Sequence, residues 1–374
     1  MSPTRIAVIG SGYFSQFHLA AWQRLGPQGA RLCGLLSLDQ QSANALCERF
    51  SISSCYKGLD ELIADAPDLV DVIVPPDSQF DLIRRLADAG IPIICQKPFC
   101  RTLEQAQMAV AYCDKKNVPL VIHENFRHQP WYRAIKAELD KGRLGKVYQL
   151  TFRIRPGDGQ GDDAYLDRQP YFRDQARFLV RETAVHWIDV FRFLVGEVES
   201  VFASLTQLNP AIKGEDAGIM LLRFASGTRG LIDGNRLSDH DADNTRLTMG
   251  EMLIEGELGV LTLNGSGVVS FRAHGSQSIE PINFAWQDVD FAGDCVYETQ
   301  KHILRHIFTN LCADSKNGAE KAQESGYNRS PPQDLSLLEN TAKDYLINRV
   351  VESCLYESSD RGCWISICEF AGQG

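Results

Sequence analysis

The stretch IAVIGSGYFS at residues 6–15 is the strongest indication of the fold in this sequence. Four apolar residues lead into two closely spaced glycines, and apolar residues recur with helical spacing at residues 17–25. A glycine-rich turn between a strand and a helix is the context of a dinucleotide-binding fingerprint. Gly10 permits the tight turn, and Gly12 lets the backbone approach a pyrophosphate at the helix N-terminus. We therefore expect a dinucleotide to contact this turn, with an ordinary glycine-rich turn as the alternative; the contacting residues would be Gly10, Gly12, Tyr13, Phe14 and Ser15.

The first 125 residues alternate short apolar runs with helical patterns. The expected strands lie at residues 6–9, 32–37, 69–74, 91–95 and 118–122. The expected helices lie at residues 17–25, 43–50 and 78–89, and one more begins at the capping-box pair Thr102 and Gln105. Strands that alternate with helices at this spacing predict a parallel sheet covered on both faces, the doubly wound Rossmann arrangement.

After residue 125 the pattern changes. A helix is expected at residues 131–139, a half-buried strand at 146–155, a polar loop at 156–173 and a helix at 182–195. From residue 198 to about 273 successive strands with Gly, Asn and Asp turns predict a mostly antiparallel, open sheet. Two helices at residues 296–312 and 336–357 close the chain, and the polar segment 314–334 between them is expected to be a mobile surface loop.

Length and composition limit the class of protein. A chain of 374 residues suits two domains, and we expect a dinucleotide-binding domain at residues 1–125 and an α+β substrate-binding domain at residues 126–374. The net charge of −10 disfavours a nucleic-acid partner. The eleven cysteines form no CxxC pair, which fits a reducing, cytoplasmic compartment without a zinc motif. Neither a secretory signal pattern nor a membrane-spanning apolar run is expected.

The end of the second expected strand bears on the choice of cofactor. A carboxylate there usually holds the ribose 2′-hydroxyl of NAD, whereas a nearby Arg favours NADP. Ser37 occupies the expected acidic place, and Asp39 lies two residues further on. Asp39 could reach the ribose or could cap the next helix, so the sequence predicts a nicotinamide cofactor, NAD or NADP, without selecting between them.

The sequence Gln96-Lys97-Pro98 follows an expected strand of the parallel sheet. Ligands of such sheets bind beyond the carboxyl ends of the strands, and Pro98 keeps Lys97 out of the helical conformation. A partly desolvated lysine beside a positively charged ring can have a pKa low enough to shuttle a proton. Lys97 is therefore a candidate acid–base group, and the alternative is a solvated surface lysine.

A second candidate group lies in the expected helix at residues 182–195. Glu182, His186 and Asp189 stand at i, i+4 and i+7, hence on one helix face. His186 can exchange a proton near neutral pH, and either Glu182 or Asp189 can set its tautomer. The alternative is a structural histidine bonded to one carboxylate. No third metal ligand is evident, so no metal site is expected.

The motifs together resemble the Gfo/Idh/MocA family of oxidoreductases over nearly the whole chain. They are Gly10-Ser11-Gly12 with His18, Pro75-Pro76, Gln96-Lys97-Pro98 and Glu182-x-x-x-His186-x-x-Asp189, in family order. The resemblance implies hydride transfer between a sugar-type hydroxyl carbon and nicotinamide C4, with Lys97 and His186 as the catalytic pair. It also implies that Pro75 and Pro76 flank the nicotinamide and that the second domain's open sheet forms homodimers or homotetramers.

This sequence departs from the family pattern at two positions. The usual Glu-Lys-Pro is Gln96-Lys97-Pro98 here, so Lys97 lacks a neighbouring charge. The acid four residues before the histidine is commonly Asp and here is Glu182.

Phrases such as HENFRHQPWYRAIK and ETAVHWIDVFRFL are similar to a branch of the family that acts on D-apiose. That resemblance implies a sugar pocket lined, with His186, by Glu124, Arg127, Arg155, Tyr165, Gln169 and Arg173. A solvated loop is the alternative for the residues between 155 and 174. We therefore expect an NAD(P)-dependent sugar or polyol oxidoreductase. The alternatives are an NAD-dependent glycoside-cleaving enzyme and a cofactor-binding regulatory protein without turnover.

Overall fold

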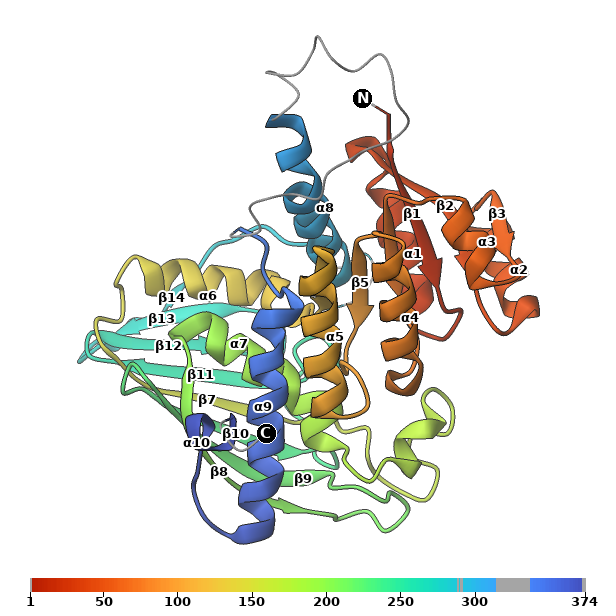
Figure 1. Ribbon diagram of the computed structural model, residues 1–374. Coiled ribbons are helices and arrows are strands. Elements are labelled where there is room, and N and C mark those ends of the chain that lie inside the picture. The colour runs from red at the N-terminus through yellow and green to blue at the C-terminus, as the bar shows by residue number, and fades with distance from the viewer. Residues whose placement is uncertain (1, 288, 290–291, 314–336, 372–374) are drawn as a thin grey trace. The chain divides into compact units, whose positions relative to one another are not determined.

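The computed structural model describes residues 2–287, 289, 292–313 and 337–371 (Figure 1). The described chain forms two compact units, Met1–Glu124 with Val296–Leu346 and Asn125–Cys295 with Ile347–Gly374. The first unit therefore includes a later segment of the chain, which the expected domains at residues 1–125 and 126–374 did not anticipate. The segment 314–334, expected to be a mobile loop, lies outside the described residues.

The first unit contains a six-stranded, fully parallel sheet in the order β3-β2-β1-β4-β5-β6. This is the strand order of a dinucleotide-binding Rossmann fold, which confirms the expected fold class. The strands are β1 (Thr4–Ile9), β2 (Ala30–Leu36), β3 (Ser54–Tyr56), β4 (Leu69–Val72), β5 (Ile93–Gln96) and β6 (Leu120–His123). Their helices are α1 (Ser15–Arg24), α2 (Gln40–Arg49), α3 (Leu59–Ala64), α4 (Pro76–Asp88) and α5 (Leu103–Lys116).

Local signals account for several of these boundaries. Thr102 caps α5 by accepting a hydrogen bond from the Gln105 amide at 3.2 Å, as the capping-box pattern predicts. The sequence predicts neither β3 nor α3, because three and six residues are too short to establish a period.

The core of the first unit explains why the chain returns to it after residue 295. Helix α8 (Cys295–Ala313) contributes Ile303, Leu304 and Ile307 to the apolar cluster that contains Ile6 of β1 and Trp22 of α1. The apolar face of α8 thus removes area from water against the same sheet that the first 124 residues build. Helical periodicity predicts that such a face exists but not which sheet will bury it.

The second unit contains a nine-stranded sheet in the order β14-β13-β12-β11-β7-β10-β9-β8-β15. Among the described strands of this sheet only β7 and β10 pair in parallel, so the expected mostly antiparallel sheet is confirmed. The strands are β7 (Val147–Ile154), β8 (Val198–Thr206), β9 (Ala217–Phe224), β10 (Arg229–Asn235), β11 (Gly250–Gly256), β12 (Gly259–Leu263), β13 (Val269–Ala273), β14 (Glu280–Pro281) and β15 (Ile365–Ser366).

Helices cover one face of this sheet. They are α6 (Pro130–Asp140), α7 (Val185–Val195), the part of α9 (Ala342–Arg361) from residue 347 on, and α10 (Ile367–Ala371) (Figure 1). Trp187 of α7 stacks on Phe152 of β7 with ring centroids 4.2 Å apart, and the Trp187 indole donates to the Tyr132 hydroxyl of α6 at 2.8 Å. These buried aromatic contacts hold α6 and α7 on the sheet.

The start of the helix expected at residues 182–195 differs from the expectation. Residues Leu179–Ala184 form a π-helical turn, and only Val185–Val195 are α-helical. The Glu215 carboxylate caps this turn by accepting from the amides of Phe178 and Val180 at 3.1 and 3.0 Å. Because a π turn is wider than an α turn, Glu182 does not have the α-helical i, i+4 relation to His186 that the sequence analysis assumed.

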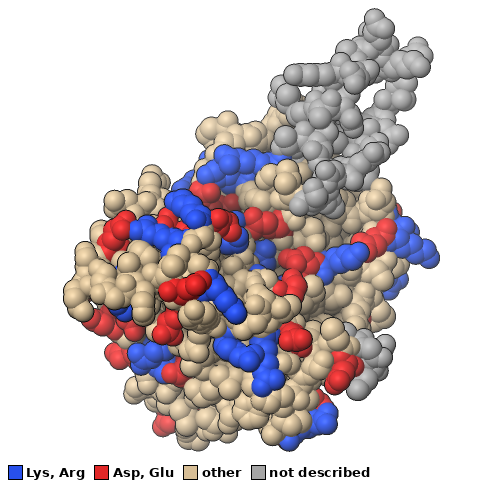
Figure 2. Space-filling model, turned by 90° about the vertical axis from the view of Figure 1, so that its left-hand side faces the viewer, with Lys and Arg blue, Asp and Glu red and all other residues tan. Residues whose placement is uncertain are grey.

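Surface charge is mixed on the face that Figure 2 draws. Lys and Arg side chains are interspersed there with Asp and Glu, and the described residues on that face form no basic stripe. Phosphate backbones require clustered positive charge, so that face does not resemble a nucleic-acid surface. No helix in the described ranges combines the length and hydropathy that crossing a membrane requires.

Candidate functional site

The turn after β1 has the backbone that a dinucleotide site needs. Gly10 has φ +119°, and a Cβ there would lie 2.1 Å from the Ile73 carbonyl oxygen, so only glycine fits. A Cβ at Gly12, by contrast, would meet no protein atom within 4 Å. No side chain caps the N-terminus of α1, which begins at Ser15. Open space beside an uncapped helix N-terminus fits a pyrophosphate.

The end of β2 holds Ser37 and Asp39 in different roles. The Ser37 hydroxyl lies 2.7 Å from the Ser11 hydroxyl and so joins the β2 end to the glycine turn. Asp39 caps α2, accepting from the Ser42 amide at 3.1 Å and the Ser42 hydroxyl at 2.6 Å. These bonds lower the pKa of the Asp39 carboxyl, which stays exposed and ionised. The capping alternative is therefore observed, and a ribose contact remains a prediction.

A buried glutamine that the sequence analysis missed ties together the loops at the strand ends. Helix α4 begins at Pro76, and Gln79 in its first turn donates to the carbonyls of Val74 and Gln96 at 3.1 and 2.9 Å. The same side chain accepts from the Cys100 amide at 2.7 Å. Gln79 is fully buried, so these bonds fix the backbone before Pro75 and around Lys97.

Lys97 directly follows β5, at the carboxyl edge of the sheet. Its side chain is half-buried, and its peptide bond to Pro98 is cis. The Lys97 amide donates to the Gln96 side-chain oxygen at 2.7 Å, and Gln96 itself is buried against His18. The position of Lys97 at a strand tip is therefore the one that the motif predicts, and a proton-transfer role stays a prediction.

In the second unit α7 presents His186 and Asp189. His186 is buried and stacks on Phe126, with ring centroids 3.8 Å apart and planes 8° from parallel. Arg127 donates two hydrogen bonds to the Asp189 carboxylate at 2.7 and 2.6 Å, and Asn348 donates a third at 2.8 Å. The structure thus makes Arg127, which was expected to line the sugar pocket, part of a buried ion pair with Asp189.

Glu182 lies before α7 and accepts a hydrogen bond from the Gln175 side chain at 2.8 Å. Glu124 is buried at the end of β6 in the first unit, where its backbone carbonyl accepts from Asn340 at 3.0 Å. Arg173 is half-buried, and its guanidinium donates to the Ala211 carbonyl at 3.4 Å.

Two residues expected in the sugar pocket, Arg155 and Tyr165, bond to other protein groups in this structure. Arg155 is buried at the end of β7 and donates to the backbone and carboxylate of Asp233, at 2.7 and 2.5 Å. Tyr165 is 4% exposed, and its hydroxyl accepts from Arg236 at 2.8 Å. These internal bonds fix the position of both side chains, and a sugar contact from either stays a prediction.

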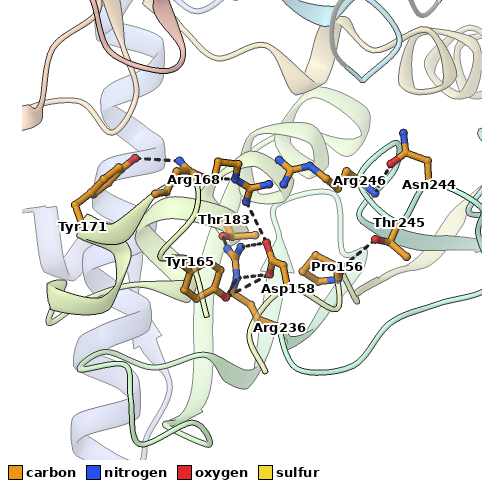
Figure 3. A network of polar contacts seen from close by, with 11 residues as sticks. Pro156, Asp158, Tyr165, Arg168, Tyr171, Thr183, Arg236, Asn244, Thr245 and Arg246 are labelled. Atoms are coloured by element: carbon orange, nitrogen blue, oxygen red, sulfur yellow. Dashed lines mark hydrogen bonds and ion pairs between the residues drawn. The ribbon is translucent and has the colours of Figure 1, made fainter. Parts of the chain in front are cut away.

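Arg236 is the centre of the network that Figure 3 shows, and the sequence analysis missed it. Its buried guanidinium donates to Asp158 at 2.7 Å and also to Thr183 and Tyr165. Its central carbon lies 5.1 and 4.8 Å from the ring centroids of Tyr165 and Phe178. Arg236 therefore links the polar loop to the π-helical turn that precedes α7.

The contribution of the Arg236–Asp158 ion pair to stability can be tested by removing the carboxylate. Asp158→Ala is expected to lower the free energy of unfolding by about 3 kcal/mol, because the buried Arg236 charge would lose its carboxylate. Arg168→Ala is the matched control, since Arg168 contacts the same carboxylate at 3.4 Å from a more exposed position and should cost less than about 1 kcal/mol. Urea unfolding of both variants measures the difference, and equal losses would contradict the role of Arg236.

Polar side chains of the same loop stay accessible beside this network. Gln169 donates to the Tyr171 hydroxyl at 3.1 Å and accepts from Arg168 at 3.2 Å. Tyr171 is 54% exposed as a residue, but desolvation of its hydroxyl and the nearby charge of Glu182 raise the pKa of the phenol to about 12, so it stays protonated. Tyr171 and Arg168 were missed because a polar loop carries no periodic signal that separates ligand contacts from solvated side chains.

The Rossmann sheet, its open glycine turn and a lysine at a strand tip define a nicotinamide-dependent oxidoreductase. A family model described as "Oxidoreductase family, NAD-binding Rossmann fold" matches residues 4–124, and the "GFO/IDH/MocA C-terminal domain" model matches residues 132–262. The chain belongs to this Gfo/Idh/MocA family, and its first unit is an NAD-binding Rossmann domain. No group of three or more His, Cys, Asp or Glu side chains among the described residues is placed to hold a metal ion.

Named relatives support the family assignment. The chain is 31% identical to a D-apiose dehydrogenase of Paraburkholderia graminis over 352 residues, which cover 92% of this chain and 88% of that relative. A D-apiose dehydrogenase of Rhizobium rhizogenes is 32% identical over 234 residues, 62% of this chain and 66% of that relative. The fold matches a solved oxidoreductase of Agrobacterium radiobacter, in complex with NAD+, L-tartaric acid and magnesium, with a TM-score of 0.81 and 24% identity over 98% of this chain and 99% of that chain.

Proposed function

We propose that this oxidoreductase oxidises a small aldose at its anomeric carbon to the lactone, with D-apiose as the substrate and NAD as the hydride acceptor. The observation that carries the proposal is the 31% identity to a named D-apiose dehydrogenase across 92% of this chain. The accessible Gln169, Tyr171 and Arg168 support it, because amide, phenol and guanidinium groups can bond several sugar hydroxyls.

Bound NAD would supply nicotinamide C4 as the acceptor of the hydride that leaves the anomeric carbon. We propose that Lys97 accepts the proton of the reacting hydroxyl, which leaves the lactone as product. We propose His186 as a second acid–base group, and its flat stacking on Phe126 fixes the plane of its ring. Arg127 donates to Asp189 and Gln175 donates to Glu182, so each carboxylate has a fixed position within the second unit.

All of the proposed cofactor contacts are made by residues of the first unit. We propose that the pyrophosphate binds at Gly10, Gly12, Tyr13, Phe14 and Ser15, the ribose near Ser37 and Asp39, and the nicotinamide near Pro75, Pro76, Gln96 and Lys97. The ionised, exposed Asp39 would repel a 2′-phosphate, and residues 37–48 include neither Lys nor Arg. These features favour NAD over NADP.

We also propose that the protein works in the cytoplasm as a homodimer or homotetramer. Across the second unit's sheet, Leu253, Thr151, Leu231, Leu221 and Phe202 stand opposite one another on adjacent strands. None of these side chains is fully buried, and they point away from the face that α7 covers. This row is apolar except for Thr151, and a row of this kind fits a contact with a second copy. Light scattering that shows only monomer would contradict the assembly.

A panel of sugars tests the function. We expect D-apiose with NAD to produce reduced-nicotinamide absorbance, and kcat/KM for D-apiose to exceed the values for other aldoses and for inositols. The same measurements with NADP in place of NAD show which cofactor the enzyme prefers.

The comparisons do not favour a glycoside-cleaving enzyme or a regulatory protein. Release of sugar from a nitrophenyl glycoside, without activity on any free sugar, would reverse that conclusion, and cofactor binding without turnover would support a regulatory protein.

A further inference from the structure

A buried chain of polar side chains leads from α1 to Lys97 in the first unit. His18 of α1 and Asp71 of β4 are both fully buried, and His18 Nδ1 lies 2.8 Å from Asp71 Oδ2. On its other side, His18 Nε2 lies 3.1 Å from Gln96 Nε2. Gln96 Oε1 accepts from the Lys97 amide at 2.7 Å. The chain therefore runs Asp71–His18–Gln96–Lys97 through three hydrogen bonds.

The direction of each bond follows from the last one. A backbone amide can only donate, so the Gln96 atom that faces Lys97 is the oxygen, and the atom that faces His18 is the NH2 group. That NH2 group donates, so His18 Nε2 must accept and carries no hydrogen. The single hydrogen of a neutral imidazole is then on Nδ1 and is donated to Asp71.

The surroundings of His18 fit this neutral state. The Trp22 indole donates to the same Asp71 oxygen at 2.8 Å, and Gln300 lies 3.3 Å from the His18 carbonyl. The ring of His123 lies against the His18 ring with centroids 4.1 Å apart. Burial lowers the pKa of His123 well below its usual value, so its ring is neutral too.

We propose that His18 and Asp71 position Gln96, that Gln96 in turn positions the backbone of Lys97, and that the residue at 96 decides the protonation of His18. With Gln96, His18 is neutral and protonated at Nδ1. A carboxylate at this position could still accept from the Lys97 amide, but it would have no hydrogen to donate. His18 Nε2 would then face an oxygen and would take up one proton, becoming an imidazolium between two carboxylates.

The claim about the protonation of His18 can be tested without any substrate. In the full chain labelled with 15N-histidine, NMR should show His18 with one protonated nitrogen, Nδ1, and one bare nitrogen, Nε2. The signal is assigned by its loss in His18→Asn. In Gln96→Glu both nitrogens should be protonated at neutral pH. A doubly protonated or Nε2-protonated His18 in the natural sequence would overturn the proposal, as would an unchanged His18 in Gln96→Glu.

The claim that Gln96 positions Lys97 rests on the proposed function and is tested by steady-state kinetics. Gln96→Ala should lower kcat roughly 10-fold with little change in KM for the sugar, because the Lys97 amide loses its acceptor. Gln96→Glu should recover part of that loss, since a carboxylate restores the acceptor. Gln41→Ala, at an exposed site on α2, is the control. Equal kcat in the natural protein and Gln96→Ala would refute positioning. If the protein oxidises no sugar, the proposed substrate fails and the NMR result still decides the protonation of His18.

Discussion

Replacing Lys97 with alanine is expected to lower kcat by about 10²–10⁴-fold while NAD affinity changes by no more than a few-fold. Proton transfer by a positioned side chain typically contributes a factor of that size. Lys97 lies at the tip of β5, half-buried, with its amide bonded to Gln96. Truncation at Cβ removes the ammonium group and leaves the backbone bonds that Gln79 and Gln96 make. Steady-state kinetics and NAD titration measure the two quantities separately.

A matched lysine separates the local effect from a general loss of charge. Lys116 ends α5 and bonds to Asp88 at 2.5 Å on the surface of the same unit. Lys116→Ala should leave kcat within a factor of two, because exposed ion pairs contribute little even to stability. If Lys97→Ala retains a rate within a few-fold of the natural protein, Lys97 is not the acid–base group and His186 becomes the first candidate.

Gly12→Val is expected to abolish NAD binding in a protein that still folds. A Cβ at Gly12 meets no protein atom within 4 Å, so the chain itself tolerates a side chain there. A pyrophosphate at the helix N-terminus would collide with the branched side chain. NAD at about 100 times its Kd should stabilise the natural protein by about 2.7 kcal/mol. Thermal unfolding of Gly12→Val should show none of this stabilisation.

Gly10→Ala distinguishes loss of the cofactor from loss of the fold. A Cβ at Gly10 would approach the Ile73 carbonyl oxygen to 2.1 Å, and Gly10 has φ +119°. We expect this variant to unfold at a lower temperature even without NAD, whereas Gly12→Val should not. NAD stabilisation that survives undiminished in Gly12→Val would remove the glycine turn from the cofactor site.

Local patterns determined the architecture of both units. The apolar run before Gly10 predicted β1 and the first turn of the Rossmann fold, because glycine spacing and strand periodicity are properties of adjacent residues. Thr102 and Gln105 predicted the start of α5 for the same reason. Strands with regular turns after residue 198 predicted an antiparallel sheet. Lys97 was found as a candidate because its strand and its proline lie beside it in the sequence.

Only the tertiary structure decided which polar groups remain available for chemistry. Arg127 bonds to Asp189, 62 residues away, and Arg236 bonds to Asp158 across 78 residues. Buried charges and hydrogen-bonding groups require partners, and the partner is whichever group the packing brings near. The same holds for α8, whose apolar face is buried against β1 and α1. Periodicity along the chain determines which face of an element is apolar or polar, whereas the fold in three dimensions determines what that face meets.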